Sequence, residues 1–243
     1  MEWTDEAYVL SARAFGETGA IVELLTETNG RYAGHVAGGA SRKMKPFLQP
    51  GARVIARYRA RTSEQLGSVV LEPMGEGPAA LFDDPLALAG LSAAAAVAAA
   101  ALPEREAHPG AFAAFEALAG AFAFPEIWPA VFVRFEAGLL EELGFGLDLS
   151  RCAVTGSVDD LIYVSPKTGR AVSRDAGEPY RERLLALPPF LLGSQGGLGE
   201  GDVAAGLALT GHFLEQFVFG PLNRPLPPAR VWLVERLHAA ERL

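Results

Sequence analysis

The sequence predicts an α+β protein in which a five-stranded β-barrel is followed by an α-helical domain. Residues 6–74 read as short β-like segments separated by glycine-containing turns. Beyond residue 77 helical periodicity dominates, and Ala, Leu and Phe replace the β-branched and basic residues of the first part. We therefore predict one domain at residues 1–76 and a second domain at residues 77–243.

Five strands are predicted in the first domain. Asn29-Gly30 lies between two apolar segments, which is a strong signal for a hairpin turn. A longer connection separates the third strand from the fourth, and five strands with this spacing are typical of an OB-type barrel. An SH3-like barrel is the structural alternative. The predicted strands are Tyr8–Phe15, Ala20–Thr26, Arg31–Ala37, Arg53–Thr62 and Leu66–Glu72.

The second domain is predicted to be helical, with a non-helical insert at about residues 148–176. In its third helix Phe132, Phe135 and Leu139 recur on one face, which indicates a core-facing stripe. Within the insert, the sequence predicts a β-hairpin that turns at Pro166–Gly169. The predicted helices are Leu86–Ala101, Ala111–Phe124, Ala130–Leu143, Asp202–Phe219 and Ala229–Ala240.

Basic side chains are concentrated in one stretch of an acidic chain. The net charge is −8, yet residues 1–75 carry 9 basic and 8 acidic side chains, and no acidic residue lies between Glu27 and Glu64. Arginines alternate with apolar residues over 53–61, which predicts a strand with one basic face. Such a surface points to a polyanion, most often nucleic acid, although a solvated basic face is the alternative. The predicted contacts are Arg31, Arg42, Lys43, Lys45, Arg53, Arg57, Arg59 and Arg61.

Two aromatic residues accompany these cations, and Phe47 is the candidate for base stacking. Single-strand binders combine aromatic rings with basic side chains in this way. Phe47 and Tyr58 can each equally be core residues, and the sequence leaves both interpretations open.

No catalytic or metal-binding pattern is present in the sequence. None of the four histidines lies three or four residues from another, and Cys152 is the single cysteine, with no base near it in sequence. The acidic pairs Glu141-Glu142 and Asp159-Asp160 are adjacent and point in different directions on a helix or strand. The sequence therefore predicts no catalytic residue, no metal and no cofactor. An interaction adaptor and a nucleic-acid enzyme are the alternatives to a DNA-binding protein.

A cytoplasmic location is predicted. The acidic start of the chain is unlike a secretory signal, and a single cysteine fits a reducing compartment. Leu86–Leu102 has 17 uncharged residues, but ten are Ala and the flanks are acidic. We therefore predict a packed helix that starts at Asp84 and Pro85, and no membrane partner.

Four segments of the chain resemble the RecO family of bacterial DNA repair proteins. The fourth segment lies in the helical domain and is distinctive. It contains Glu-Glu-Leu-Gly-Phe-Gly-Leu-Asp-Leu and is followed by Cys152. The likeness covers most of the chain in the right order. The segments are Tyr8–Thr18, Val22–Glu27 with Gly30-Arg31, Lys45–Gly51 and Leu139–Leu149.

This resemblance implies a recombination mediator with an N-terminal OB fold and a helical C-terminal domain. Such a protein binds single- and double-stranded DNA, anneals complementary strands and, together with RecR, helps load RecA onto DNA coated by single-strand-binding protein (SSB). The implied partners are DNA, RecR, the C-terminal tail of SSB and, indirectly, RecA, and the implied location is the cytoplasm, at the nucleoid. Arg134 is the candidate contact for the acidic, apolar SSB tail.

The resemblance also implies a zinc-ribbon-like insert, and here the sequence departs from the family. Many relatives carry two Cys-x-x-Cys pairs in the insert, which hold zinc. The matching positions are Cys152, Thr155, Ser173 and Ala176, so three of the four thiolates are absent. We therefore expect a hairpin without structural zinc, in which Thr155 and Ser173 keep local polar contacts.

Overall fold

A computed structural model describes residues 1–62, 65–75, 77–193, 198–240 and 242. The chain forms two compact units, which are described separately below. The first contains Met1–Phe122 with Pro227–Leu233, and the second contains Ala123–Leu226 with Val234–Leu243. The domain limits predicted at 1–76 and 77–243 stay a prediction, and Glu76 lies outside the described residues.

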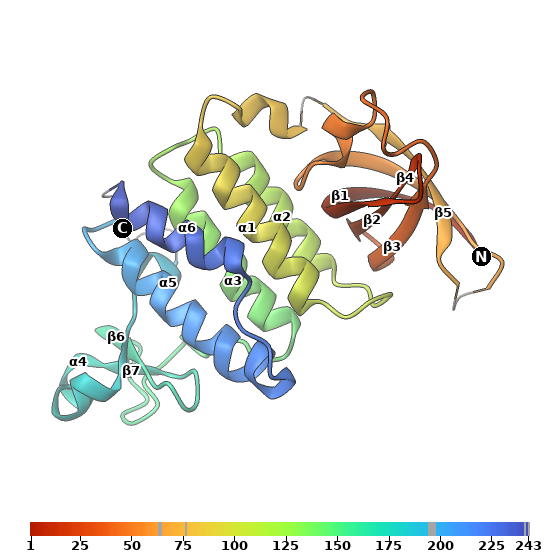
Figure 1. Ribbon diagram of the computed structural model, residues 1–243. Helices are drawn as coiled ribbons and strands as arrows, with labels where there is room; N and C mark the ends of the chain where they lie inside the picture. The colour runs from red at the N-terminus through yellow and green to blue at the C-terminus, as the bar shows by residue number, and fades with distance from the viewer. Residues whose placement is uncertain (63–64, 76, 194–197, 241, 243) are drawn as a thin grey trace. The chain divides into compact units, whose positions relative to one another are not determined.

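The first five strands close into a barrel, as predicted (Figure 1). Their order is β1-β2-β3-β5-β4, and β4 pairs back onto β1. β3 and β5 run parallel, whereas the other neighbours are antiparallel. With the long connection between β3 and β4, this is a five-stranded OB-type barrel. The strands are β1 Glu2–Phe15, β2 Gly19–Thr26, β3 Gly30–Val36, β4 Arg53–Arg59 and β5 Gly67–Pro73.

β1 is longer than predicted because it belongs to two pairings. Its residues 2–8 pair with β4, and its residues 7–15 pair with β2. A register shift between Val9 and Ser11 bends the strand at the point where it passes from one partner to the other. β4 ends at Arg59, three residues earlier than predicted, so Arg61 lies beyond the sheet.

Aromatic rings fill part of the barrel interior. Trp3 stacks on Tyr58 with ring centroids 4.9 Å apart, and Tyr32 meets both rings edge-on. The Tyr58 hydroxyl accepts a hydrogen bond from the Gly67 amide at 2.9 Å. Tyr58 is therefore a core residue. The sequence leaves open whether Tyr58 packs in the core or stacks on bases, and the structure places it in the core.

Two helices of the first unit, α1 (Pro85–Ala101) and α2 (Pro109–Ala121), follow the barrel in the chain. α1 begins as predicted, since the Asp84 carboxylate accepts hydrogen bonds from the first amides of the helix. Tyr8 of β1 lies against Phe112 and Phe115 of α2, with ring centroids 5.5 and 5.0 Å apart. Gly51 has a φ of 83°, and a Cβ there would lie 2.4 Å from Leu91, so only glycine lets this turn approach α1.

In the second unit, α3 (Trp128–Glu142) packs against α5 (Asp202–Phe213). The predicted apolar stripe of α3 is buried, and Gly206 of α5 makes room for Val133. The predicted helix Asp202–Phe219 changes at Leu214, because Leu214–Phe219 is π-helical. Its remaining helices are the short α4 (Arg174–Gly177) and α6 (Pro228–Ala239), whose residues are shared between the two units.

The insert forms a small sheet around the predicted hairpin. β6 (Leu161–Val164) pairs with β7 (Ala171–Ser173), and the Gly169 amide closes the turn by donating to the Ser165 carbonyl. A third strand, β8 (Leu185–Ala186), was not predicted and pairs with β6. None of the helices in the described part of the chain has the length and apolar character needed to cross a membrane.

Candidate nucleic-acid interface

The fold separates the eight predicted cations into three groups. Two arginines are tied to the helices of the first unit, and two lie on β4 beside acidic residues of neighbouring strands. The other four make no ion pair within the described residues, which omit Ser63 and Glu64. The stretch itself contains no acidic residue, but strand pairing and helix packing bring distant carboxylates to four of the eight cations.

Arg31 holds a segment beyond α1 against the barrel. Its guanidinium lies 3.5 Å from Glu23 and 3.6 Å from Glu104, and its Nε donates to the Leu102 carbonyl at 2.8 Å. The side chain is only 15% exposed. Arg31 therefore has little surface left for a phosphate.

Arg53 has an equivalent role beside α2. Its Nη2 lies 2.6 Å from Glu6 of β1 and 2.7 Å from Glu116 of α2. The hydrogen bond to Glu6 raises the pKa of Arg53, so this guanidinium keeps its positive charge. Glu6 and Glu116 already pair with that charge. Arg31 and Arg53 both join the barrel to the rest of the first unit.

The outer face of β4 carries the next two arginines. The alternation predicted from the sequence is confirmed, since Val54, Ala56 and Tyr58 are buried. Arg57 lies 2.9 Å from Glu72 of β5, and Arg59 lies 4.0 Å from a Glu2 carboxylate oxygen on β1. These side chains are mostly exposed, so the pairs are weak and a phosphate can displace the carboxylate.

Arg42, Lys43 and Lys45 lie on the loop between β3 and β4, and all three are exposed. A groove of about 460 Å³ runs between this loop and residues 12–14 of β1, and Arg13 and Lys45 both line it. The pairing of β1 with β4 ends at Tyr8. Beyond this point β1 pairs with β2 along one edge, and the groove lies along its other edge. Its other lining residues are mostly Ala, Gly and Leu.

A row of residues runs around the outer surface of the barrel, and one of them, Ile21, is buried. The strand registers place Arg13 of β1, Ile21 of β2, His35 of β3, Ser68 of β5 and Arg59 of β4 directly beside one another. Neighbouring strands are about 4.8 Å apart, so the two arginines are separated by about 19 Å along the sheet. OB folds bind oligonucleotides on the face of strands 2 and 3, between the β1–β2 and β4–β5 loops, and this row crosses that face.

Sequence reasoning missed Arg13 and His35. The signal for Arg13 was present, because Ser11, Arg13 and Phe15 alternate with two alanines and so share one face of a strand. His35 becomes part of the row only through pairing across β2 and β5, which no local pattern contains.

Phe47 lies away from this row. It belongs to a short 3₁₀ helix, Lys45–Leu48, and its ring is half-buried. With Met74, Pro78 and Phe82 it lines an apolar groove of about 290 Å³. The structure therefore gives Phe47 apolar neighbours as well as a place beside the basic loop.

Comparison with known proteins covers almost the whole chain. Residues 1–72 match the family model described as the N terminal of recombination protein O, and residues 83–225 match the model of its C terminal. The chain belongs to the RecO family. It is 79% identical over 243 residues to the DNA repair protein RecO of Phenylobacterium zucineum, with both chains covered completely.

More distant relatives agree with this assignment. The DNA repair protein RecO of Caulobacter vibrioides strain NA1000 is 77% identical, again over the full length of both chains. That of Rhodospirillum centenum is 55% identical and is matched over 99% of this chain and 96% of its own length. Membership of the RecO family makes this chain a DNA repair and recombination protein, a non-enzymatic mediator as the sequence indicates.

In this RecO chain, Arg134 lies on α3 in the second unit. Its Nη2 donates to the Phe190 carbonyl at 2.5 Å and to the Gly193 carbonyl at 3.3 Å. It lines a groove of about 430 Å³ together with three leucines and Glu141. The groove therefore combines one cation, one anion and an apolar wall.

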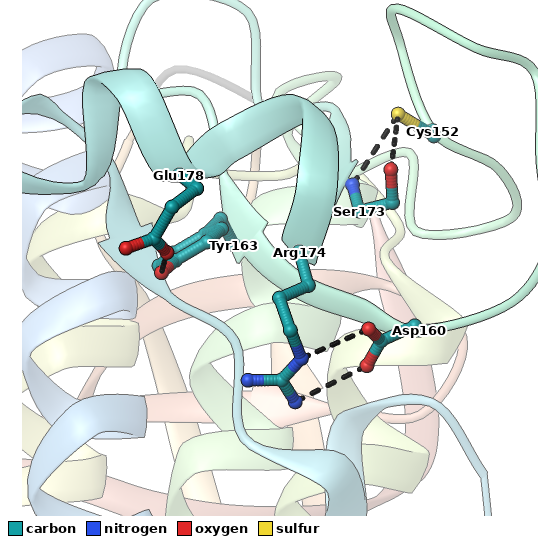
Figure 2. A network of polar contacts seen from close by, with 6 residues as sticks. All are labelled: Cys152, Asp160, Tyr163, Ser173, Arg174 and Glu178. Carbon is teal, nitrogen blue, oxygen red and sulfur yellow. Dashed lines mark hydrogen bonds and ion pairs between the residues drawn. The ribbon is translucent and has the colours of Figure 1, made fainter.

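The insert of this RecO chain is organised around the Cys152 sulfur (Figure 2). Cys152 is buried, and its Sγ accepts hydrogen bonds from the amide and the hydroxyl of Ser173, both at 3.3 Å, and from the Thr155 amide at 3.5 Å. Burial opposes ionisation of the Cys152 thiol, but these hydrogen bonds outweigh it and lower its pKa to about 6. The expected polar contacts of Thr155 and Ser173 are confirmed.

The residues around Cys152 do not fit a zinc ion. Zinc needs about four ligand atoms, whereas N–H and O–H donors aim their hydrogens at this sulfur, and Ala176 has no ligand atom. In the part of the chain that the structure describes, no group of three or more His, Cys, Asp or Glu side chains is placed to hold a metal. In the same insert, Arg174 forms a two-point ion pair with Asp160, at 2.9 and 3.2 Å (Figure 2). This pair joins α4 to the start of the hairpin.

Proposed function

We propose that the protein binds single- and double-stranded DNA on its barrel, anneals complementary strands, and helps load RecA onto SSB-coated DNA together with RecR. The observation that carries the DNA-binding proposal is a group of cations at the groove and on the loop beside it that make no ion pair within the described residues: Arg13, Arg42, Lys43 and Lys45. Arg57, Arg59 and Arg61 extend the proposed surface to the other side of the barrel face. Arg31, Arg53 and Phe47 contribute to this surface indirectly. The two arginines join the barrel to the rest of the first unit, and Phe47 lines the apolar groove beside the loop.

Annealing needs no bond chemistry under this proposal. Two complementary strands repel each other because both are polyanions, and a surface that neutralises phosphates on both raises their encounter rate. Contacts to phosphates carry no sequence information, which suits a protein that has to act on any strand.

The second part of the chain is better suited to protein partners. Residues 76–243 carry 12 basic and 21 acidic side chains, a net charge of −9 that repels DNA. We propose that the groove containing Arg134 receives the acidic, apolar tail of SSB, since it offers a cation next to Leu147, Leu149 and Leu191. RecR binding and a cytoplasmic location at the nucleoid complete the proposal on the basis of family membership.

A strand-annealing assay tests the proposal. Complementary oligonucleotides labelled with a donor and an acceptor dye are mixed with the protein, with and without an SSB coat, in the absence of ATP and metal. The wild-type protein should accelerate duplex formation, and R42A/K43A/K45A should lose most of this acceleration. If the folded wild-type protein binds neither of the two oligonucleotides, the DNA-binding proposal fails and the alternative of an interaction adaptor takes its place.

A further inference from the structure

Phe15 is an exposed aromatic residue on the face where we propose that DNA binds. It is the last residue of β1, and the residue is 50% exposed. In contrast, the rings of Trp3, Tyr32 and Tyr58 pack together inside the barrel. The barrel therefore places Phe15 outside its core, at the turn that leads into β2.

His35 braces this ring. The two ring centroids are 5.6 Å apart and the planes meet at 70°, so the rings touch edge to face and do not stack on each other. Gly19, the strand partner of Phe15, makes the contact possible, because a Cβ at Gly19 would lie 2.4 Å from His35 Nε2. A glycine between the two strands thus lets His35 reach Phe15 and fix its orientation.

Two basic segments are connected to the position of Phe15: its own strand and the loop between β3 and β4. Arg13 lies two residues earlier on the same face of β1, about 7 Å away along the strand. On the other side, the Ala40 amide donates to the Thr18 carbonyl at 3.0 Å, which joins the basic loop to the turn that follows Phe15. Under the proposed function, a strand that contacts both Arg13 and this loop passes next to Phe15.

We propose that Phe15, braced by His35, is a stacking platform for an unpaired nucleobase and makes the barrel prefer single strands to duplex DNA. This inference rests on the proposed DNA binding. Phosphates are present in both forms of DNA, so the cations alone discriminate poorly between them. Base faces are accessible only in a single strand, and stacking one base on an aromatic ring changes affinity by about 5- to 150-fold.

Phe15→Leu is the central variant, because leucine keeps an apolar side chain of similar size and removes the aromatic face. Fluorescence anisotropy measures binding to a dT12 strand and to a 12-base-pair duplex. We expect Phe15→Leu and Phe15→Ala to weaken dT12 binding at least 5-fold, to leave duplex binding within 2-fold and to leave the salt dependence unchanged. Phe15→Trp should keep dT12 binding, and its added fluorescence should be quenched by the stacked base.

Phe124→Ala is the matched control, since Phe124 is exposed by 59% and belongs to the second unit. It should change neither affinity. Phe47→Ala tests the other aromatic candidate, and a selective loss of dT12 binding there but not at Phe15 would overturn the inference. Equal loss on both forms of DNA in Phe15→Leu would also overturn it, because that result indicates a structural role. If the wild-type protein binds no DNA, the proposed function itself fails, and this outcome is distinct from the other two.

Discussion

Removing the three cations of the β3–β4 loop should change how DNA binding depends on salt. Five cations on or beside the barrel face make no ion pair within the described residues: Arg13, Arg42, Lys43, Lys45 and Arg61. If they neutralise about five phosphates, the log–log salt slope on single strands is about −3.5, and R42A/K43A/K45A should reduce it to about −1.4. Between 50 and 200 mM salt, the wild-type protein would then lose about 130-fold in affinity and the variant about 7-fold.

Anisotropy titrations of labelled dT12 at four salt concentrations measure both slopes. The matched control is R151A/R181A/R183A, which removes three exposed cations from the second unit and changes the net charge by the same amount. The control should keep the wild-type slope, because its arginines lie outside the proposed surface. Identical slopes in the wild-type protein and the folded loop variant would refute the assignment of the loop to the DNA surface.

Three further predictions concern single residues. Glu72→Gln should raise the affinity for single strands a few-fold, because it releases Arg57 from its carboxylate partner; a weaker affinity in anisotropy titrations would contradict this. Arg31→Met should lower the free energy of unfolding in urea by about 1–3 kcal/mol and leave the salt slope unchanged, since a buried carbonyl loses its donor. Folding lowers the pKa of the Cys152 thiol from 9.0 to about 6. The stability advantage of the wild-type protein over Cys152→Ala should therefore be complete above pH 9 and decline as the pH falls towards 6. Parallel curves of unfolding free energy against pH over this range would show that Cys152 is not a thiolate in the folded protein.

The sequence predicted most elements of the fold because their signals are local. Alternating residues marked β4, and the Asn29-Gly30 turn marked the hairpin of β2 and β3. Asp84 with Pro85 marked the start of α1. The first half of β1 was missed because residues 2–7 become a strand through pairing with β4, some fifty residues later in the chain.

The candidate site was predicted less completely, for a physical reason. A basic stretch is visible in one dimension, but the carboxylates that neutralise it come from other strands and helices. Glu104 and Glu116 lie more than sixty residues beyond the arginines that they pair with. Likewise, the contact between Phe15 and His35 depends on the register of two strand pairs and on a glycine between them.

The attachment of the barrel to its two helices limits how this chain can be divided. Residues 104–106 run along β3: Glu104 bridges to Arg31, the Arg105 amide donates to the Arg31 carbonyl at 2.8 Å, and a Cβ at Gly30 would collide with the Glu106 carbonyl. A fragment cut after the last barrel strand would expose Tyr8, and it would remove Glu104 from Arg31 and Glu116 from Arg53. The barrel is therefore not a portable module, and a fragment intended to carry its surface into another protein has to continue through α2.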